Sequence, residues 1–126
     1  MLSLIVTLIY ASMISYTIMN AITIKKIESS VHPETKKVFW NLFASTRGAT
    51  NRIKIMSLLK ERPSNTNQIS TYVEVDYKSA SHHLKTLEEN YLVEKYAHSG
   101  TTTYFVSQLF EENEQVFDEI ISMFNS

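Results

Sequence analysis

The sequence predicts a mainly α-helical fold with a small β-hairpin, preceded by a single N-terminal hydrophobic helix. The chain has 126 residues, and its first 24 residues carry no charged side chain. Apolar side chains then recur at helical spacing in several segments between residues 34 and 125. Between residues 92 and 107, two runs rich in Val, Tyr, Phe and Thr flank Gly100, which is the pattern of two strands joined by a turn.

Residues 1–24 are predicted to form a transmembrane anchor. As a helix they would extend about 36 Å at about 1.5 Å per residue, more than the roughly 30 Å hydrocarbon core of a bilayer. Lys25 and Lys26 follow directly and no basic residue precedes the run, so the positive-inside rule places the rest of the chain in the cytoplasm. We therefore expect a single-pass protein of the cell membrane, with a linker at 25–33 and a cytoplasmic domain at 34–126. The alternative is a cytoplasmic protein whose first helix is a buried dimerisation arm, because polar residues such as Ser12 and Asn20 interrupt the run.

A stripe of small side chains follows one side of this first helix. Ser3, Thr7, Ala11 and Ser15 recur every four residues. In lipid, such a stripe lets two helices approach closely. Self-association of the segment and a chance alignment of small residues fit this pattern equally well.

The composition excludes several kinds of chemistry. The chain has no cysteine, which rules out disulfides, thiolate metal sites and a cysteine nucleophile. Its two glycines, Gly48 and Gly100, are too far apart to form a phosphate-binding loop. The net charge is −1, but all twelve basic residues lie between Lys25 and Lys95, and the segment from Gln108 onward contains only acidic charges. A basic body of this kind is compatible with a polyanionic partner.

Long helices are expected at both ends of the domain. The helix at 34–45 places Phe39 and Phe43 on one face, and the next helix, at 47–61, ends before Pro63. The last helix, at 108–125, has an apolar stripe that includes Phe110 and Phe117. We expect this stripe to pack against the 34–45 helix or against a second chain.

Two shorter helices with clear start signals lie between these segments. Asn65 and Gln68 have the spacing of a capping box. Asp76 is a strong N-cap for the helix that follows, and that helix should end near Asn90. A tight connection separates the two helices, as in a helix-turn-helix.

The order of these elements places a helix-turn-helix directly before a hairpin, where the wing of a winged helix belongs. The stretch NRIKIMSLLKERPSNTNQISTYVEVDYKSASHHLKTLEENYLVEKYAHSGTTTYFVS resembles the winged helix-turn-helix of ArsR-like transcriptional regulators, over about residues 45–107. The combination of NRIKIMSLL, then SASHHLKTLEENYLV, then the hairpin carries the resemblance. The similarity is greatest to archaeal members in which a hydrophobic N-terminal segment precedes the domain.

The resemblance implies that double-stranded DNA is the partner, with the helix after Asp76 in the major groove. It also implies a dimer that reads two half-sites about one helical turn apart. Two departures from the family pattern matter. The family often has a glycine at the position of Tyr91, so we expect Asn90 to turn the end of the helix instead. Metal-sensing members use cysteines, or histidines on the last helix, and this chain has neither, so metal sensing is not implied.

The adjacent histidines His82 and His83 are not expected to bind a metal together. Neighbouring helix residues point about 100° apart, which is a poor geometry for gripping one ion. His83 lies near the apolar side of the helix and is predicted to be a packed, hydrogen-bonded residue. His82 lies on the open side with Lys78, Ser81 and Lys85, where side chains can reach base edges and phosphates.

The candidate DNA-binding residues come from three neighbouring elements. Arg47 and Arg52 have two possible roles, since each could contact DNA or pair with an acid inside the fold. The predicted DNA-binding residues are Tyr77, Lys78, Ser79, Ser81, His82 and Lys85 in the recognition helix, Asn65 and Gln68 at the start of the preceding helix, and Lys95, His98, Thr101 and Thr102 in the hairpin.

The predicted function is a sequence-specific DNA-binding transcriptional regulator that is tethered to the membrane through residues 1–24. A homodimer is expected through residues 34–45 and 108–125. No enzymatic constellation, metal site, cofactor site or small-molecule substrate is evident. The alternative is a membrane-associated winged-helix module that binds proteins and not DNA, because the basic body between Lys25 and Ser107 has an excess of only four positive charges.

Overall fold

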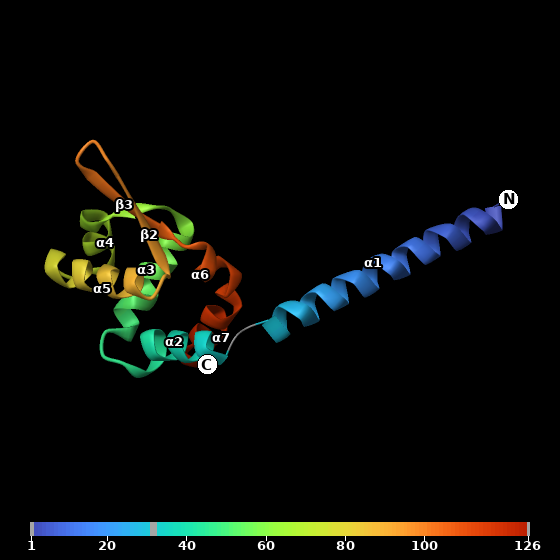
Figure 1. Cartoon of the computed structure of the whole chain (residues 1–126), viewed down its shortest axis with the longest axis horizontal. Helices are drawn as coiled ribbons and strands as arrows, with labels where there is room; N and C mark the ends of the chain where they lie inside the picture. The colour runs from blue at the N-terminus through green and yellow to red at the C-terminus, as the bar shows by residue number, and fades with distance from the viewer. Residues whose placement is uncertain (1, 31–32, 126) are drawn as a thin grey trace. The chain divides into compact units, whose positions relative to one another are not determined.

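The computed structural model describes the backbone of residues 2–30 and 33–125, and the side chains of residues 3–18 and 33–125. The chain divides into two compact units, Met1–Pro33 and Glu34–Ser126. The first unit contains one helix, and the second contains the remaining helices and strands (Figure 1).

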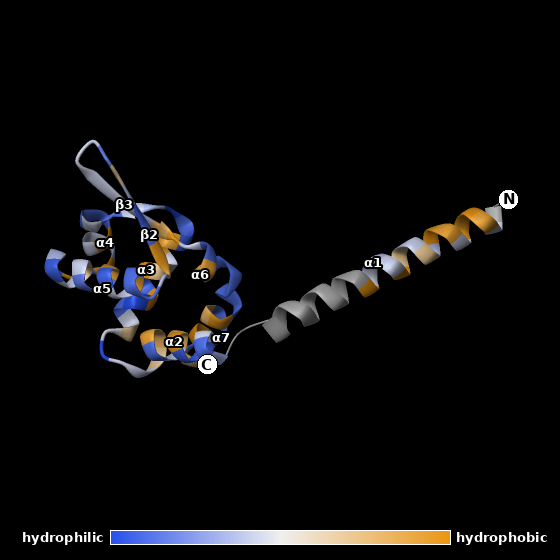
Figure 2. Cartoon of the chain, viewed as in Figure 1, coloured by the Kyte–Doolittle hydropathy of each residue, from blue (hydrophilic) through white to orange (hydrophobic). Residues whose placement is uncertain are grey.

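The first helix, α1, runs from Leu2 to Ser30. The predicted linker at 25–33 is therefore helical up to Ser30, which fits the absence of Gly and Pro between Lys25 and Ser30. Large apolar side chains of α1, such as Leu4 and Tyr10, are exposed. The described hydrophobic residues of this helix gather toward its N-terminal end (Figure 2). Within the described residues, no helix combines the length and the apolarity that crossing a membrane requires. The predicted transmembrane anchor at 1–24 thus gains no support from the structure.

The second unit is mainly helical, with a small sheet (Figure 1). A short α-helix continues directly into a π-helical turn, η1, and two further helices then precede the helix α5. Its elements are α2 (Pro33–Trp40), η1 (Asn41–Ser45), α3 (Ala49–Glu61), β1 (Ser64–Asn65), α4 (Thr66–Val73), α5 (Tyr77–Glu89), β2 (Val93–His98), β3 (Thr101–Val106), α6 (Gln108–Glu112) and α7 (Glu114–Phe124).

The sheet has three strands in the order β1-β3-β2, and both pairs are antiparallel. The predicted hairpin is β2 and β3, and its turn residues Ser99 and Gly100 both have positive φ, at 51° and 79°. Two consecutive positive φ values are what a two-residue type I′ hairpin turn requires. The sequence did not predict β1, a two-residue strand in which Ser64 pairs with Tyr104 and Asn65 with Thr103. This pairing joins the wing to the start of α4.

Four buried phenylalanines form a cluster that joins the first segment of the domain, α2 and η1, to its last segment, α6 and α7. Phe39 of α2 stacks on Phe110 of α6 with ring centroids 6.0 Å apart, and Phe43 of η1 meets Phe117 of α7 edge to face at 5.0 Å. Two edge-to-face contacts complete the cluster: Phe39 with Phe43 at 5.6 Å, and Phe110 with Phe117 at 5.1 Å. All four rings are essentially inaccessible to solvent. The apolar stripe of the C-terminal segment therefore packs against the 34–45 segment of the same chain.

The end of α5 differs from the sequence prediction. Asn90 has φ −97°, whereas Tyr91 has φ 61° and occupies the left-handed region. The backbone N–H of Tyr91 donates to the Glu88 carbonyl, and that of Leu92 donates to the Leu87 carbonyl, each at 2.9 Å. These two bonds form a Schellman motif with tyrosine at the position that glycine usually takes. The prediction that Asn90 turns the chain is therefore wrong; its side-chain amide caps the Thr86 carbonyl at 2.8 Å.

The C-terminal segment consists of two helices that meet at Asn113. Ser107 caps α6 by accepting a hydrogen bond from the Phe110 backbone N–H at 3.1 Å. Its hydroxyl also donates to the Tyr91 carbonyl at 2.6 Å, which attaches α6 to the left-handed turn after α5. Asn113, with φ −119° and ψ 16°, leaves the helical region and separates α6 from α7. The predicted single helix at 108–125 is thus interrupted by one residue.

Candidate nucleic-acid interface

The helix α5 has two distinct faces. Ala80, Leu84 and Leu87 are fully buried against the rest of the domain. Residues 78, 81, 82 and 85 lie on the opposite side at helical spacing. Lys78, His82 and Lys85 are exposed there, and Ser81 is half-buried. The structure therefore brings these four predicted DNA-binding residues together on one accessible face.

The start of α5 is fixed by Asp76. Its carboxylate accepts a hydrogen bond from the Ser79 backbone N–H at 2.9 Å. Hydrogen bonds from Ser79, first from its hydroxyl and then from its backbone N–H, lower the pKa of Asp76. Ser79, predicted as a DNA contact, thus has a structural role at the helix cap as well. Tyr77 begins the helix and is 57 % exposed.

The start of α4 is fixed by a reciprocal pair of hydrogen bonds. The Gln68 backbone N–H donates to Asn65 Oδ1, and the Asn65 backbone N–H donates to Gln68 Oε1, each at 2.9 Å. This confirms the capping box that the sequence predicts. Both side chains were also predicted as DNA contacts, and their oxygens are already engaged inside the protein.

A polar hollow of about 250 Å³ lies where the starts of α4 and α5 meet the wing. It brings together four predicted residues, Asn65, Tyr77, Thr101 and Thr102, from three elements. It also includes Asn67, which sequence reasoning missed, although an exposed amide in the first turn of a helix is a recognisable signal. The lining residues are Asn65, Thr66, Asn67, Tyr77, Gly100, Thr101 and Thr102.

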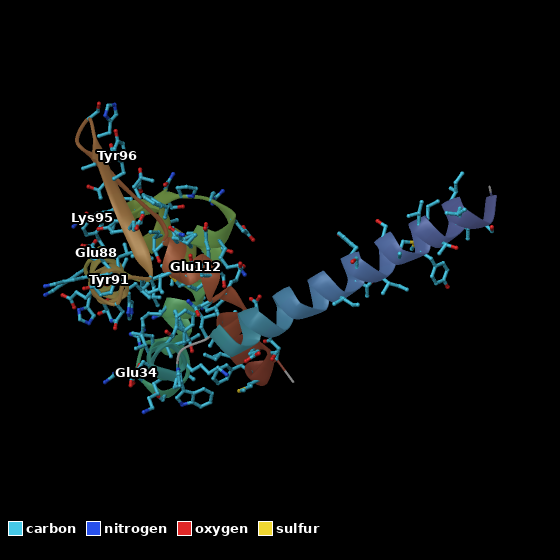
Figure 3. The ribbon with its side chains drawn as sticks, turned by 45° about the vertical axis from the view of Figure 1, so that its right-hand side comes forward. Glu34, Glu88, Tyr91, Lys95, Tyr96 and Glu112 are labelled. Atoms are coloured by element: carbon cyan, nitrogen blue, oxygen red, sulfur yellow. The ribbon has the colours of Figure 1, made fainter. Side chains whose placement is uncertain are left out.

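The wing contributes less positive charge than the sequence predicts. Lys95 of β2 forms an ion pair with Glu88 of α5 at 3.3 Å, where the two elements lie side by side (Figure 3). His98 is exposed at the end of β2, and its ring stacks on that of Tyr96 with centroids 6.1 Å apart. The charge of Lys95 is therefore partly neutralised, and the accessible positive charge of α5 is concentrated at Lys78 and Lys85.

Arg52 connects the first helices of the domain to α5. It is only 5 % exposed, and its guanidinium donates to the Leu42 carbonyl at 2.8 Å and to the Thr46 hydroxyl. Nη1 lies 3.5 Å from Nδ1 of His83. The ion pairs found among the described residues involve Lys60 and Lys95, so the suggestion that Arg52 pairs with an acid is not confirmed.

His83 is buried on the inner side of α5, 9 % exposed, as predicted for a packed histidine. Burial lowers its pKa, and the positive charges of Arg52 and, to a lesser extent, His82 lower it further. Since Arg52 can only donate, the hydrogen-bond network assigns His83 an unprotonated Nδ1 that accepts. Among the described residues, no cluster of three or more His, Asp or Glu side chains is arranged to hold a metal ion.

A three-strand sheet, a helix-turn-helix and an exposed second helix define a winged helix-turn-helix protein. Residues 50–95 match the family model described as bacterial regulatory protein, arsR family. None of the curated protein sequences matches the chain.

Solved structures with the same fold include known regulators. The homodimeric winged helix-turn-helix DNA-binding domain of a possible ArsR-family transcriptional regulator from Mycobacterium bovis is 17 % identical, with a TM-score of 0.56, and the match covers 68 % of this chain and 76 % of that one. The reduced form of the transcriptional regulator YodB from B. subtilis is 21 % identical, with a TM-score of 0.58 and coverage of 73 % and 89 %. The transcriptional repressor BigR from Xylella fastidiosa is 16 % identical, with a TM-score of 0.56 and coverage of 72 % and 83 %.

Proposed function

We propose that this protein is a DNA-binding transcriptional regulator that reads double-stranded DNA with α5. The observation that carries the proposal is the single exposed face formed by Lys78, Ser81, His82 and Lys85, on the second helix of a winged helix-turn-helix. Lysine, serine and histidine side chains on such a helix can contact base edges and phosphates in the major groove. The match of residues 50–95 to the arsR family model supports the same role.

The remaining predicted residues would act around this helix. The polar hollow lined by Asn65, Tyr77, Thr101 and Thr102 is suited to the DNA backbone beside the groove, because it offers hydroxyl and amide donors next to the N-terminus of α4. His98 at the wing tip would contact the adjacent backbone. Gln68, Ser79 and Lys95 would contribute mainly by holding the interface in shape, since each already has a partner within the protein.

A homodimer through residues 34–45 and 108–125 is part of the proposal. The Mycobacterium bovis domain of the same fold is described as homodimeric. In this chain, the four phenylalanines of these segments are used internally, but Trp40 and Phe124 remain 47 % and 59 % exposed. Large apolar side chains left on the same terminal segments are the surface that a second copy would cover.

The location of the protein is a separate proposal with its own test. Residues 1–24 were predicted to tether the chain to the cell membrane, with the DNA-binding domain in the cytoplasm. Recovery of the full chain in the membrane fraction after a carbonate wash would support this tether. Recovery in the soluble fraction would leave α1 as a dimerisation arm in a cytoplasmic regulator.

Titration of the full chain with a pool of genomic duplexes tests the proposed function. We expect enrichment of particular sequences and an affinity that falls as salt rises from about 50 mM to about 200 mM. In the Lys78→Ala/Lys85→Ala variant, the slope of log affinity against log salt should decrease by about 2, because each phosphate contact contributes about 0.9.

The matched control compares Lys54→Ala with Lys85→Ala: Lys54→Ala removes one lysine charge from an exposed position on α3 that lies outside the predicted interface and outside the segments of the proposed dimer. This control should retain the affinity and the slope of the natural chain. Equal loss in both variants would mean that the domain attracts DNA only through its overall charge. Absence of binding to any duplex at low salt would favour the alternative, a winged helix that binds another protein.

A further inference from the structure

A buried junction around Arg52 meets α5 at one titratable residue, His83. The junction consists of the Leu42 carbonyl, Thr46, Gly48, Arg52 and His83. Arg52 spans it, with Nε 2.8 Å from the Leu42 carbonyl oxygen and Nη1 3.5 Å from His83 Nδ1. Among the hydrogen-bond partners of Arg52 in the described part of the chain, His83 is the one that belongs to α5.

Gly48 lies close to both His83 and Arg52 in this junction. Gly48 has φ 88°, and a Cβ at this position would lie 2.7 Å from His83 Cε1 and 3.1 Å from Arg52 Nη1. Such distances mean that the imidazole ring rests directly on the backbone of Gly48. This contact acts together with the burial of Ala80, Leu84 and Leu87 to set the roll of α5 about its own axis, which determines where Lys78, His82 and Lys85 point.

The charges around His83 favour its neutral form. Arg52 approaches from α3, and His82 is its neighbour on α5. The η1 segment Asn41–Ser45 contributes no charged residue, and α4, Thr66–Val73, contributes only Tyr72, which is exposed. The loop between η1 and α3 adds Arg47, whose carbonyl accepts from Arg52. No acidic side chain among these described neighbours offsets a second positive charge beside Arg52.

We propose that Arg52 and His83 are positioning residues for the recognition helix, and that protonation of His83 releases this helix and weakens DNA binding. A protonated imidazole would present N–H to N–H across the 3.5 Å contact with Arg52, and so would replace a hydrogen bond by repulsion. Burial and the two neighbouring charges lower the pKa of His83, so the neutral, DNA-binding form prevails at neutral pH. Acidification below the ordinary histidine pKa would then be the signal.

The sign of the pH response distinguishes this mechanism from ordinary electrostatics. His82 and His98 are exposed on the face that would meet DNA. Positive charge gained on that face can only strengthen the attraction to phosphate. A loss of affinity on acidification has to arise from a group that is not on this face.

The test is fluorescence anisotropy of a labelled mixed-sequence duplex with the full chain at about pH 8 and about pH 5. The measured quantity is the ratio of the affinities at the two pH values, for the natural chain and for the His83→Gln variant. The glutamine amide oxygen can accept a hydrogen bond from Arg52 at either pH. We expect the natural chain to lose at least about tenfold in affinity at the lower pH, equivalent to about 1.4 kcal/mol, and the variant to lose none or to bind more tightly. If the affinity of the natural chain is unchanged or higher at the lower pH, the inference is overturned and the proposed function is left intact.

This inference rests on the proposed function, and two further measurements keep the two separately testable. If His83→Gln does not fold, the NMR titration of the His83 imidazole in the natural chain must have the same midpoint as the loss of affinity. If no duplex binds at either pH, the proposed function fails. The release of α5 is then tested by itself, through amide hydrogen-exchange protection factors of this helix at the two pH values. Protection that falls between the higher and the lower pH supports it, and unchanged protection rejects it.

Discussion

Tyr91 adopts a backbone conformation that is costly for its residue type. Its φ of 61° places a side chain with a Cβ in the left-handed region, at a cost of about 1 kcal/mol relative to glycine. The Schellman bonds and the contact from Ser107 retain it there. Because the side chain is 74 % exposed, little packing compensates for this cost.

Tyr91→Gly is therefore expected to stabilise the domain by about 1 kcal/mol, measured by urea unfolding. The matched control is Asn90→Gly, one residue earlier, where φ is −97°. At that position, glycine only adds conformational freedom to the unfolded chain and removes the hydrogen bond to the Thr86 carbonyl. The free energy of unfolding of the control should therefore fall by about 1 kcal/mol. Equal effects at the two positions would show that the left-handed turn is not strained.

Gly48 and Gly100 have similar positive φ values, 88° and 79°, in different surroundings. A Cβ at Gly48 would lie 2.7 Å from His83 Cε1, whereas a Cβ at Gly100 would meet nothing within 4 Å. Gly100→Ala should cost about 1 kcal/mol for the backbone alone, and Gly48→Ala about 2 kcal/mol or more because the ring must also move. Thermal unfolding of both variants measures the difference. A cost at Gly48 no larger than that at Gly100 would contradict the close contact.

At the scale of whole elements, Lys60 attaches α3 to α7. Its Nζ lies 2.6 Å from Glu114 Oε1 and 3.3 Å from Asp118 Oδ1, and 5.6 Å from the centre of the Phe117 ring. The hydrogen bond to Glu114 is the main cause of a raised pKa for Lys60. A lysine with a raised pKa contributes stability that is complete below its unfolded pKa and is lost as the pH rises through its folded pKa.

A double-mutant cycle with Lys60→Met and Glu114→Gln should give a coupling free energy of about 0.5 kcal/mol at neutral pH, because both groups are partly exposed. The coupling should decrease in high salt and disappear at strongly alkaline pH. Lys54→Met, at an exposed position of the same helix, combined with Glu114→Gln serves as the control and should be additive. A coupling that survives alkaline titration would exclude an ionic origin.

At the scale of the whole molecule, the proposed dimer depends on apolar side chains that the fold leaves exposed. Trp40→Glu/Phe124→Glu should weaken self-association by at least about tenfold, since each charge would have to be buried in the interface. Sedimentation velocity over a range of concentrations measures this change. Tyr72→Glu, at a 54 % exposed aromatic position on α4, is the control and should leave the assembly unchanged. Identical sedimentation of all three proteins would remove these segments from the interface.

Local signals made most of the fold predictable. The capping box at Asn65, the N-cap at Asp76 and the turn at Gly100 each have a characteristic sequence, and each was found where expected. The prediction failed where long-range contacts decide. The strand β1 forms only because β3 lies beside it, and Tyr91 is held in place by Ser107, sixteen residues later in the chain.

The candidate interface was predictable to a similar extent. Helical spacing was enough to place Lys78, His82 and Lys85 on the open face of α5. No spacing rule could show that Lys95 pairs with Glu88, because the ion pair joins a strand to a helix. The partner of Arg52 was also hidden, since His83 lies thirty-one residues away in the sequence.

The cluster of four phenylalanines has a consequence for how the protein acquires its structure during synthesis. Phe39 and Phe43 emerge from the ribosome early, but their partners Phe110 and Phe117 are among the last residues of the domain to be made. Until then, two large apolar rings remain without cover, and the helix-turn-helix lacks the layer beneath it. The domain should therefore complete its core only after α7 has left the ribosome, and until then these rings are open to association with other chains.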